Sequence, residues 1–273
     1  MSAPEPAEFS AEPFDQSLDL CGDVLGAGLR ALFAGNQFMV LPELFAAFSG
    51  ATGSGPVFYE TLPPGIIVRQ LRSGALRVGA LELRFTPDLI ASSPAALAAL
   101  KDEGLVGEAT VYASNCLTLL VAPGNPMGIE SLADLGRPGV RLALPDPRTE
   151  GIGRLALAAL EDEGGSALRQ RIQGHKREAG ETLLTSIHHR QSPSWLAQGL
   201  VDAAIVWETE AIHAARSHQP VQALPLDPLN RQRGRYAAAV VHHAPHPGAA
   251  AALEAFLNAE EGRQIYRSHG FQA

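Results

Sequence analysis

The stretch LFAGNQFMVLPELFAAF, residues 32–48, changes character in its middle. Its first part completes an apolar run that predicts a strand over 29–34, and its last part repeats apolar residues at helical spacing, which predicts a helix over 38–48. Between them, at 35–37, stands Gly-Asn-Gln, which carries no charge. The stretch therefore predicts a strand-to-helix junction with small uncharged hydrogen-bond donors.

The same alternation continues along the first half of the chain. Further strands are predicted at 56–62 and 89–91, and each is followed by a helical pattern. The second of these helices begins after Ser93, a good cap, with Pro94 in its first turn. Alternating strands and helices predict an α/β fold with mostly parallel sheets.

A second α/β series follows in the second half. The apolar run at 115–123 is continuous, which predicts a strand buried on both faces. The later strands are predicted at 140–144, 201–207, 221–225 and 236–241. Two more helices close the chain after this second series is complete, so we expect the tail to pack on the first series.

Length, charge and composition restrict the class of protein. The 273 residues can form one large domain or two lobes, and the formal net charge of −8 does not favour nucleic acid or an anionic membrane as a partner. No apolar run is long enough for a transmembrane helix, and no signal peptide is visible. Cys21 and Cys116 are too far apart in sequence for a CxxC site, and whether they pair stays open.

Small residues gather at four strand-to-helix junctions, at 35–37, 61–65, 92–94 and 146–153. In open α/β sheets, ligands bind beside the carboxyl ends of strands, and the N–H groups at a helix N-terminus attract anions without a formal charge. The alternative is that these residues only cap their helices, as small polar residues commonly do. The four junctions together favour a polar region that accepts an anion.

Several longer stretches carry a family resemblance. In chain order they are TPDLIASS, LLVAPGNP, SLADLGRPGVRLALPDP, GLVDAAIVWETEA and FLNAEEGRQIYRSHGF. With these stretches, the chain from residue 29 to residue 271 resembles the bacterial extracellular solute-binding proteins of the molybdate-binding type, the type 2 periplasmic family. The resemblance implies two lobes with helices on both faces of mostly parallel sheets, and a hinge of crossing strands.

This resemblance also implies domain boundaries and a ligand site. We expect a flexible lead-in at 1–28, lobe 1 at 29–116 plus 242–273, and lobe 2 at 117–241. The junctions and the resemblance together imply that the ligand-binding residues are Gly35, Asn36, Gln37, Thr61, Ser92, Gly151, Ile152, Gly153, His189, Arg190 and Trp207.

The chain departs from the molybdate-binding pattern at three of these places. Family members that bind molybdate use mainly uncharged donors, including a tyrosine. In this chain Gly-Asn-Gln at 35–37 replaces a turn of the small-residue and serine type, Trp207 stands at the tyrosine position, and the segment with His189 and Arg190 brings charged groups to the rim. Arg190 could clamp an oxyanion in bidentate fashion or lie at the rim beside a helix start. Trp207 could donate through its indole N–H or pack as a core aromatic. The identity of the anion therefore stays open.

Neither enzyme nor metal chemistry has a clear signature. The chain has no GxSxG, no phosphate-binding GxxxxGK[ST] and no GxGxxG after a strand. The segment HHAPH at 242–246 is rich in imidazoles but has no HExxH frame and no partnering cysteine. Glu208 and Glu210 fit an acidic first helical turn better than a catalytic carboxylate pair. We expect no catalysis, no cofactor and no bound metal.

The resemblance implies a function in uptake. We expect the substrate-binding component of an ABC-type system, which binds a small oxyanion such as molybdate or tungstate in the cleft between the lobes and delivers it to a membrane permease. The alternative is a sensory or accessory protein of the same fold that binds another small anion or organic acid. A monomer in the periplasm or outside the cell is expected.

Overall fold

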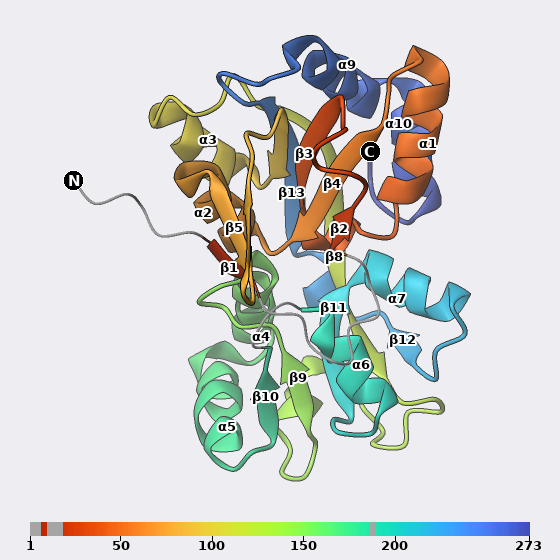
Figure 1. Ribbon diagram of the computed structural model, residues 1–273. Coiled ribbons are helices and arrows are strands. Elements are labelled where there is room, and N and C mark those ends of the chain that lie inside the picture. Colours follow the sequence, from red (N-terminus) through yellow and green to blue (C-terminus); the bar gives the residue numbers. More distant parts are fainter. Residues whose placement is uncertain (1–6, 10–18, 186–188) are drawn as a thin grey trace, which may run out of the picture. The chain divides into compact units, whose positions relative to one another are not determined.

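The computed structural model (Figure 1) describes residues 7–9, 19–185 and 189–273. It has two compact units, of which unit 1 is Met1–Ser114 with Arg235–Ala273 and unit 2 is Asn115–Gly234. Each unit is of the α/β type, with strands and helices alternating along the chain.

Two strands carry the chain across the boundary between the units. The strand β8 (Thr110–Val121) leaves unit 1 after Ser114, and β13 (Arg233–Val240) returns to it at Arg235. The expected lobe boundaries, after residues 116 and 241, fall later in the chain than these points. A continuous apolar run gives no sign of where its packing partners change, so the sequence alone could not fix these positions.

The sheet of unit 1 has the strand order β13-β7-β3-β4-β2. Its other strands are β2 (Leu20–Cys21), β3 (Leu29–Ala34), β4 (Val57–Leu62) and β7 (Leu89–Ser92). β3 pairs in parallel with both β4 and β7, whereas β2 and β13 are antiparallel to their neighbours. The parallel centre agrees with the predicted alternation, because parallel neighbours need a crossover connection.

Three helices follow the parallel strands. They are α1 (Leu41–Thr52), α2 (Pro64–Ser73) and α3 (Pro94–Asp102). A 3-10 helix, Gly35–Gln37, comes before α1, so the helix predicted from residue 38 begins three residues later. The predicted cap of α3 is confirmed, since Ser93 Oγ accepts a hydrogen bond of 3.3 Å from the Ala96 N–H.

The C-terminal tail completes the core of unit 1. It forms α9 (Pro247–Asn258) and α10 (Glu260–Ser268). Leu253 and Tyr266 on these helices, and Phe271 after them, pack in one cluster with Phe33 of β3 and Phe48 of α1. The prediction that the tail packs on the first α/β series is confirmed.

One small sheet of unit 1 has no counterpart in the sequence-based prediction. The strands β5 (Ala75–Val78) and β6 (Leu81–Arg84) form a hairpin, and β1 (Ala7–Phe9) adds to β5 in parallel. β1 and β2 lie within the segment expected to be a flexible lead-in, whose residues 1–6 and 10–18 are outside the described part. Both short strands pair with distant residues, which local patterns do not reveal.

The sheet of unit 2 has the order β10-β9-β11-β8, and a further strand also pairs with β8. The additional strands are β9 (Leu142–Leu144), β10 (Thr182–Leu184), β11 (Ala203–Trp207) and β12 (Gln222–Leu224). β9 is parallel to β10 and β11, whereas β11 and β12 are antiparallel to β8. From Cys116 to Val121 no side chain of β8 is more than 3% exposed, which confirms the predicted burial.

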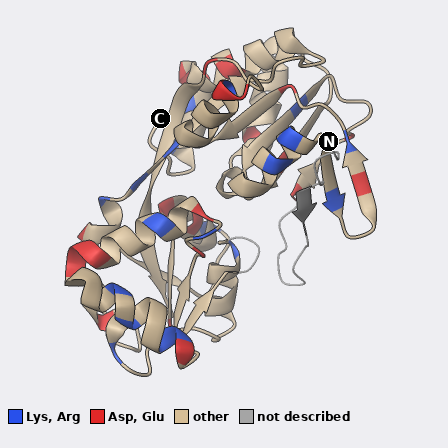
Figure 2. Cartoon of the chain, turned by 90° about the vertical axis from the view of Figure 1, so that its left-hand side faces the viewer, with Lys and Arg blue, Asp and Glu red and all other residues tan. Residues whose placement is uncertain are grey.

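Helices of very different lengths complete unit 2. They are α4 (Gly151–Gln170), α5 (Lys176–Glu178), α6 (Gln191–Ala197), α7 (Glu208–Arg216) and α8 (Asp227–Asn230). The α7 boundary confirms that Glu208 and Glu210 start a helix. Charged residues of both signs occur in both units (Figure 2). In the described part of the chain, no helix is long and apolar enough to cross a membrane.

Candidate functional site

Asn36 and Gln37 are both buried at the end of β3 and bind tyrosines of unit 1. Asn36 Nδ2 donates to the hydroxyl of Tyr236. The side-chain oxygen of Gln37, Oε1, accepts hydrogen bonds from the hydroxyl groups of Tyr112 at 2.5 Å and of Tyr266 at 2.7 Å. Gln37 Nε2 has no hydrogen-bond partner among the described residues. The side-chain amides of Asn36 and Gln37 are therefore held in place by tyrosine hydroxyl groups.

The tyrosines keep these hydroxyl groups protonated. Burial raises the pKa of both Tyr112 and Tyr266 above the usual value for tyrosine. Their rings meet edge to face, with centroids 5.2 Å apart. Since each side chain comes from a different part of the chain, β8 and α10, the network ties the junction after β3 to the C-terminal tail.

The remaining predicted residues of unit 1 lie at the ends of neighbouring strands. A Cβ on Gly35 would come within 3.0 Å of the Thr61 carbonyl oxygen, so glycine lets the chain pass close to β4. The Thr61 hydroxyl donates to Asp19 Oδ1 at 3.3 Å. Ser92 Oγ, at the end of β7, is buried and has no partner among the described residues. The ends of β3, β4 and β7 thus carry buried, uncharged polar groups.

In unit 2, the predicted residues Gly151, Ile152 and Gly153 form the first turn of α4. The first N–H groups of an α-helix have no partner within the helix, and here no side chain caps them. The Ile152 side chain lies in the core of unit 2 and is 2% exposed. A ligand contact at these three positions would therefore come from the backbone.

His189 is buried between two carboxylates and is 4% exposed. Its Nδ1 lies 2.8 Å from Glu150 Oε2, and its Nε2 lies 3.2 Å from Glu210 Oε1 as an ion pair. Burial opposes a charge on the imidazole, but the charge of Glu210 and the hydrogen bond with Glu150 outweigh it and raise the pKa of His189 to about 10. The ring is therefore an imidazolium at neutral pH.

Arg190 follows directly and stands just before α6. The sequence suggested either a ligand contact or a rim residue, and the structure leaves only 8% of Arg190 exposed. A guanidinium with so little exposure needs partners that compensate its charge. Its burial thus distinguishes it from an ordinary surface arginine.

Trp207 ends β11 and belongs to the core cluster of unit 2. It is 6% exposed, and its ring lies so close to Gly234 that a Cβ there would be 2.3 Å from Trp207 Cη2. The backbone N–H of Trp207 donates to Glu210 Oε2 at 3.2 Å, which is one half of a capping box at the start of α7. The ring packs in the core of unit 2, and whether its indole N–H also contacts a ligand stays a prediction.

The sequence analysis did not predict several residues that hold these groups in place. Glu150 and Glu210 hold His189, and Tyr236 holds Asn36. Glu210 carried a weak signal, as an acidic residue in a predicted first helical turn. The others are far from their partners in sequence, so no local spacing pointed to them.

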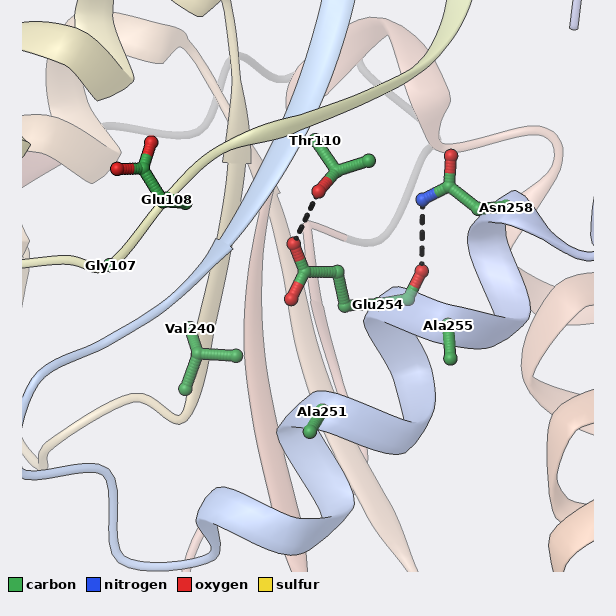
Figure 3. A pocket seen from close by; sticks show the side chains of 8 residues that line it. All are labelled: Gly107, Glu108, Thr110, Val240, Ala251, Glu254, Ala255 and Asn258. Carbon is green, nitrogen blue, oxygen red and sulfur yellow. Dashed lines mark hydrogen bonds between the residues drawn. The ribbon is translucent and has the colours of Figure 1, made fainter.

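A surface hollow of about 500 Å³ lies elsewhere in unit 1 (Figure 3). Its lining residues are Gly107, Glu108, Thr110, Val240, Ala251, Glu254, Ala255 and Asn258. The Thr110 hydroxyl donates to Glu254 Oε1 at 2.9 Å, and Asn258 Nδ2 donates to the Glu254 carbonyl oxygen at 3.0 Å. Two acidic side chains make this hollow unsuited to an anion, and none of the predicted ligand-binding residues lines it.

The cysteines and histidines do not assemble a metal site in the described residues, where no group of three or more His, Cys, Asp or Glu is placed to hold an ion. His242 Nδ1 lies 2.7 Å from the Gly104 carbonyl oxygen, and His246 pairs with Asp88. Cys21 and Cys116, both within the described part, do not form a disulfide bond. Each of these histidines therefore has a local structural partner.

Comparison with known proteins identifies the family. The family model described as "Bacterial extracellular solute-binding protein" matches residues 29–272. The chain therefore belongs to this family, which confirms the resemblance read from the sequence. The Molybdate-binding protein ModA of Mycobacterium tuberculosis is 27% identical over 212 residues, which are 76% of this chain and 74% of that protein.

Solved structures share the fold. The sulfate-binding protein SubI from Mycobacterium tuberculosis H37Rv matches with a TM-score of 0.73 at 23% identity, covering 89% of this chain and 85% of that one. The periplasmic molybdate-binding protein of Azotobacter vinelandii matches with a TM-score of 0.71 at 17% identity, covering 90% and 99%. The predicted α/β fold of periplasmic solute-binding proteins is thus confirmed.

Proposed function

We propose that this protein is the binding component of an ABC-type uptake system and that its ligand is a small oxyanion. One observation carries the proposal: proteins similar over most of this chain are named for two tetrahedral oxyanions, molybdate and sulfate. We further propose that the protein works in the periplasm or outside the cell as a monomer and delivers its ligand to a membrane permease.

The chemistry of the predicted ligand residues supports an anion. Unit 1 offers uncharged polar groups at the ends of β3, β4 and β7, and two of these, Ser92 Oγ and Gln37 Nε2, are buried without a partner among the described residues. Unit 2 offers the first-turn N–H groups of α4 and the guanidinium of Arg190. Neutral donors and a single cation can bind an oxyanion without a large cost of desolvating charge.

The proposed mechanism is closure of the two units on the ligand, and it involves no chemical step. An anion that binds donors of both units favours the arrangement in which both sets reach it at once. The strands β8 and β13 are the connections about which such a movement would occur, since the chain crosses between the units there.

A thermal-shift panel tests the proposal. Molybdate, tungstate, sulfate, phosphate and small carboxylates are added separately at millimolar concentration, and the melting temperature of the protein is measured. A ligand that binds only the folded state raises the free energy of unfolding, by about 2.7 kcal/mol at a hundred times its Kd. We expect at least one oxyanion to raise the melting temperature. Unchanged melting curves for every member would contradict the proposal.

A further inference from the structure

Three of the four polar groups of His189 form hydrogen bonds within unit 2, and the fourth, Nε2, faces a carboxylate as an ion pair. The backbone N–H donates to Glu150 Oε2 at 2.8 Å, and the carbonyl oxygen accepts from the Ser192 N–H at 2.9 Å. Nδ1 lies 2.8 Å from Glu150 Oε2, and Nε2 lies 3.2 Å from Glu210 Oε1. Every polar group of the residue thus faces a partner of unit 2, although the contact of Nε2 is an ion pair without a hydrogen bond.

The two carboxylates that hold His189 also bind other groups of unit 2. Glu150 Oε1 accepts a hydrogen bond from the hydroxyl of Thr185, and Glu210 Oε2 accepts one from the backbone N–H of Trp207 at 3.2 Å. Both carboxylates are buried, with exposures of 2% and 3%. Three of the four carboxylate oxygens accept hydrogen bonds inside the unit, and Glu210 Oε1 has only its ion-pair contact with His189.

This cluster joins four segments of unit 2. Glu150 stands immediately before α4, and Glu210 is in the first turn of α7. Thr185 follows β10, and His189 lies two residues before α6. A protonated imidazole between two carboxylates holds these helix starts together, since a neutral ring would leave two buried like charges uncompensated.

Arg190 lies inside the turn that this cluster fixes. The hydrogen bond from Ser192 N–H to the His189 carbonyl oxygen closes the turn, and Arg190 is the residue after His189. We propose that His189 is a positioning residue: its contacts with Glu150 and Glu210 fix the backbone at Arg190, which in turn contacts the anion. The assignment of Arg190 rests on the proposed function above.

The test measures the affinity for molybdate and for sulfate by titration calorimetry, together with the ¹⁵Nε signal of Arg190, assigned by its loss in Arg190→Lys. His189→Gln removes the charge and one of the two ring contacts. We expect affinity to fall on the order of tenfold, as when a charge-assisted hydrogen bond is lost, and the Arg190 signal to shift or broaden. Arg190→Ala should lower the affinity at least as much.

A double variant protects the test against simple unfolding. In His189→Gln with Glu210→Gln, one positive and one negative charge are removed together, so the buried cluster carries the same net charge as before. We expect this protein to recover most of the melting temperature lost in His189→Gln but not the affinity. A variant that loses melting temperature while the folded protein binds as the wild type does would overturn the proposal.

The remaining outcomes separate positioning from other roles. Lower affinity with an unchanged Arg190 signal would make His189 a direct ligand contact and would overturn the proposal. If the wild-type protein binds neither molybdate nor sulfate, the proposed oxyanion function is in question, and the Arg190 signal then decides alone. An unchanged signal in His189→Gln would overturn positioning, and a changed one would support it.

Discussion

Glu60 is a carboxyl group on β4 with no exposed surface. Its Oε1 accepts a hydrogen bond of 3.0 Å from Gln70 Nε2, and its Oε2 has no partner among the described residues. Burial raises the pKa of Glu60 to about 8; Asp19 also raises it, and the bond from Gln70 opposes the shift. The side chain is therefore mostly protonated in the folded protein at neutral pH.

This residue gives the protein a pH-dependent stability. The folded state keeps a proton on Glu60 that the unfolded chain releases near pH 4.5, so the contribution of Glu60 is complete below that pH and is lost as pH rises towards 8. The loss is at most about 1.4 kcal/mol per pH unit. In urea unfolding between pH 5 and pH 8, Glu60→Gln should reduce the fall in stability. The exposed control Glu163→Gln should follow the wild type, and parallel curves for all three proteins would contradict the prediction.

The contact between Trp207 and Gly234 is a second property of single residues. Gly234→Ala should displace the indole, because its Cβ would lie 2.3 Å from the ring, and should cost about 1–3 kcal/mol of the free energy of unfolding. Trp207→Phe shortens the side chain and should remove most of that penalty in the double variant. Chemical unfolding of the four proteins gives the coupling energy. Strictly additive changes would mean that the two residues do not share this space.

At the scale of an element, the first turn of α4 depends on where its glycines stand. A Cβ on Gly153 would be 2.4 Å from the Pro145 carbonyl oxygen and 2.6 Å from the Pro147 nitrogen, whereas a Cβ on Gly151 would meet only Arg154, at 3.7 Å. The helix therefore lies directly against the backbone of the loop after β9 at one position and not at the other.

The two glycines form a matched pair of variants. Gly153→Ala should lower the free energy of unfolding by about 1–3 kcal/mol, because helix and loop must move apart. Gly151→Ala should be neutral or slightly stabilising, since alanine favours helix over glycine. Thermal unfolding measures both. Equal effects of the two substitutions would show that the close approach at residue 153 does not limit this helix.

At the scale of the whole molecule, unit 2 is one continuous segment and unit 1 needs both ends of the chain. Phe271, near the C-terminus, is 3% exposed, and its ring centroid lies 5.7 Å from that of Tyr236 and 5.0 Å from that of Tyr266. The core of unit 1 is therefore incomplete until the last residues of the chain are in place.

This arrangement predicts where a tail substitution acts. Phe271→Ala should cost about 3–5 kcal/mol by opening a cavity among buried aromatics. In Phe271→Ala, amide hydrogen exchange should become faster in residues 29–114 than in residues 115–234. The exposed control Gln264→Ala should leave the amides of both ranges protected. Equal loss of protection in the two units would mean that the chain unfolds as one cooperative body.

The candidate site was only partly open to prediction from sequence. The strand ends and helix starts that carry Asn36, Ser92 and Arg190 follow from local periodicity and capping residues. The partners of these groups did not follow: Tyr236 is 200 residues from Asn36, and the burial of Arg190 depends on the packing of unit 2. Whether the predicted residues contact a ligand stays a prediction.

The sequence by itself determined the strand–helix alternation, the buried strand within 115–123, the cap at Ser93 and the family. These features rest on spacing and residue type within a few turns of chain, which a linear pattern records. The tertiary structure alone decided that β1 pairs with β5, where the chain crosses between units, and that His189 lies between Glu150 and Glu210. Such contacts join residues that are distant in sequence, and only the packed fold brings their charges and hydrogen bonds within reach.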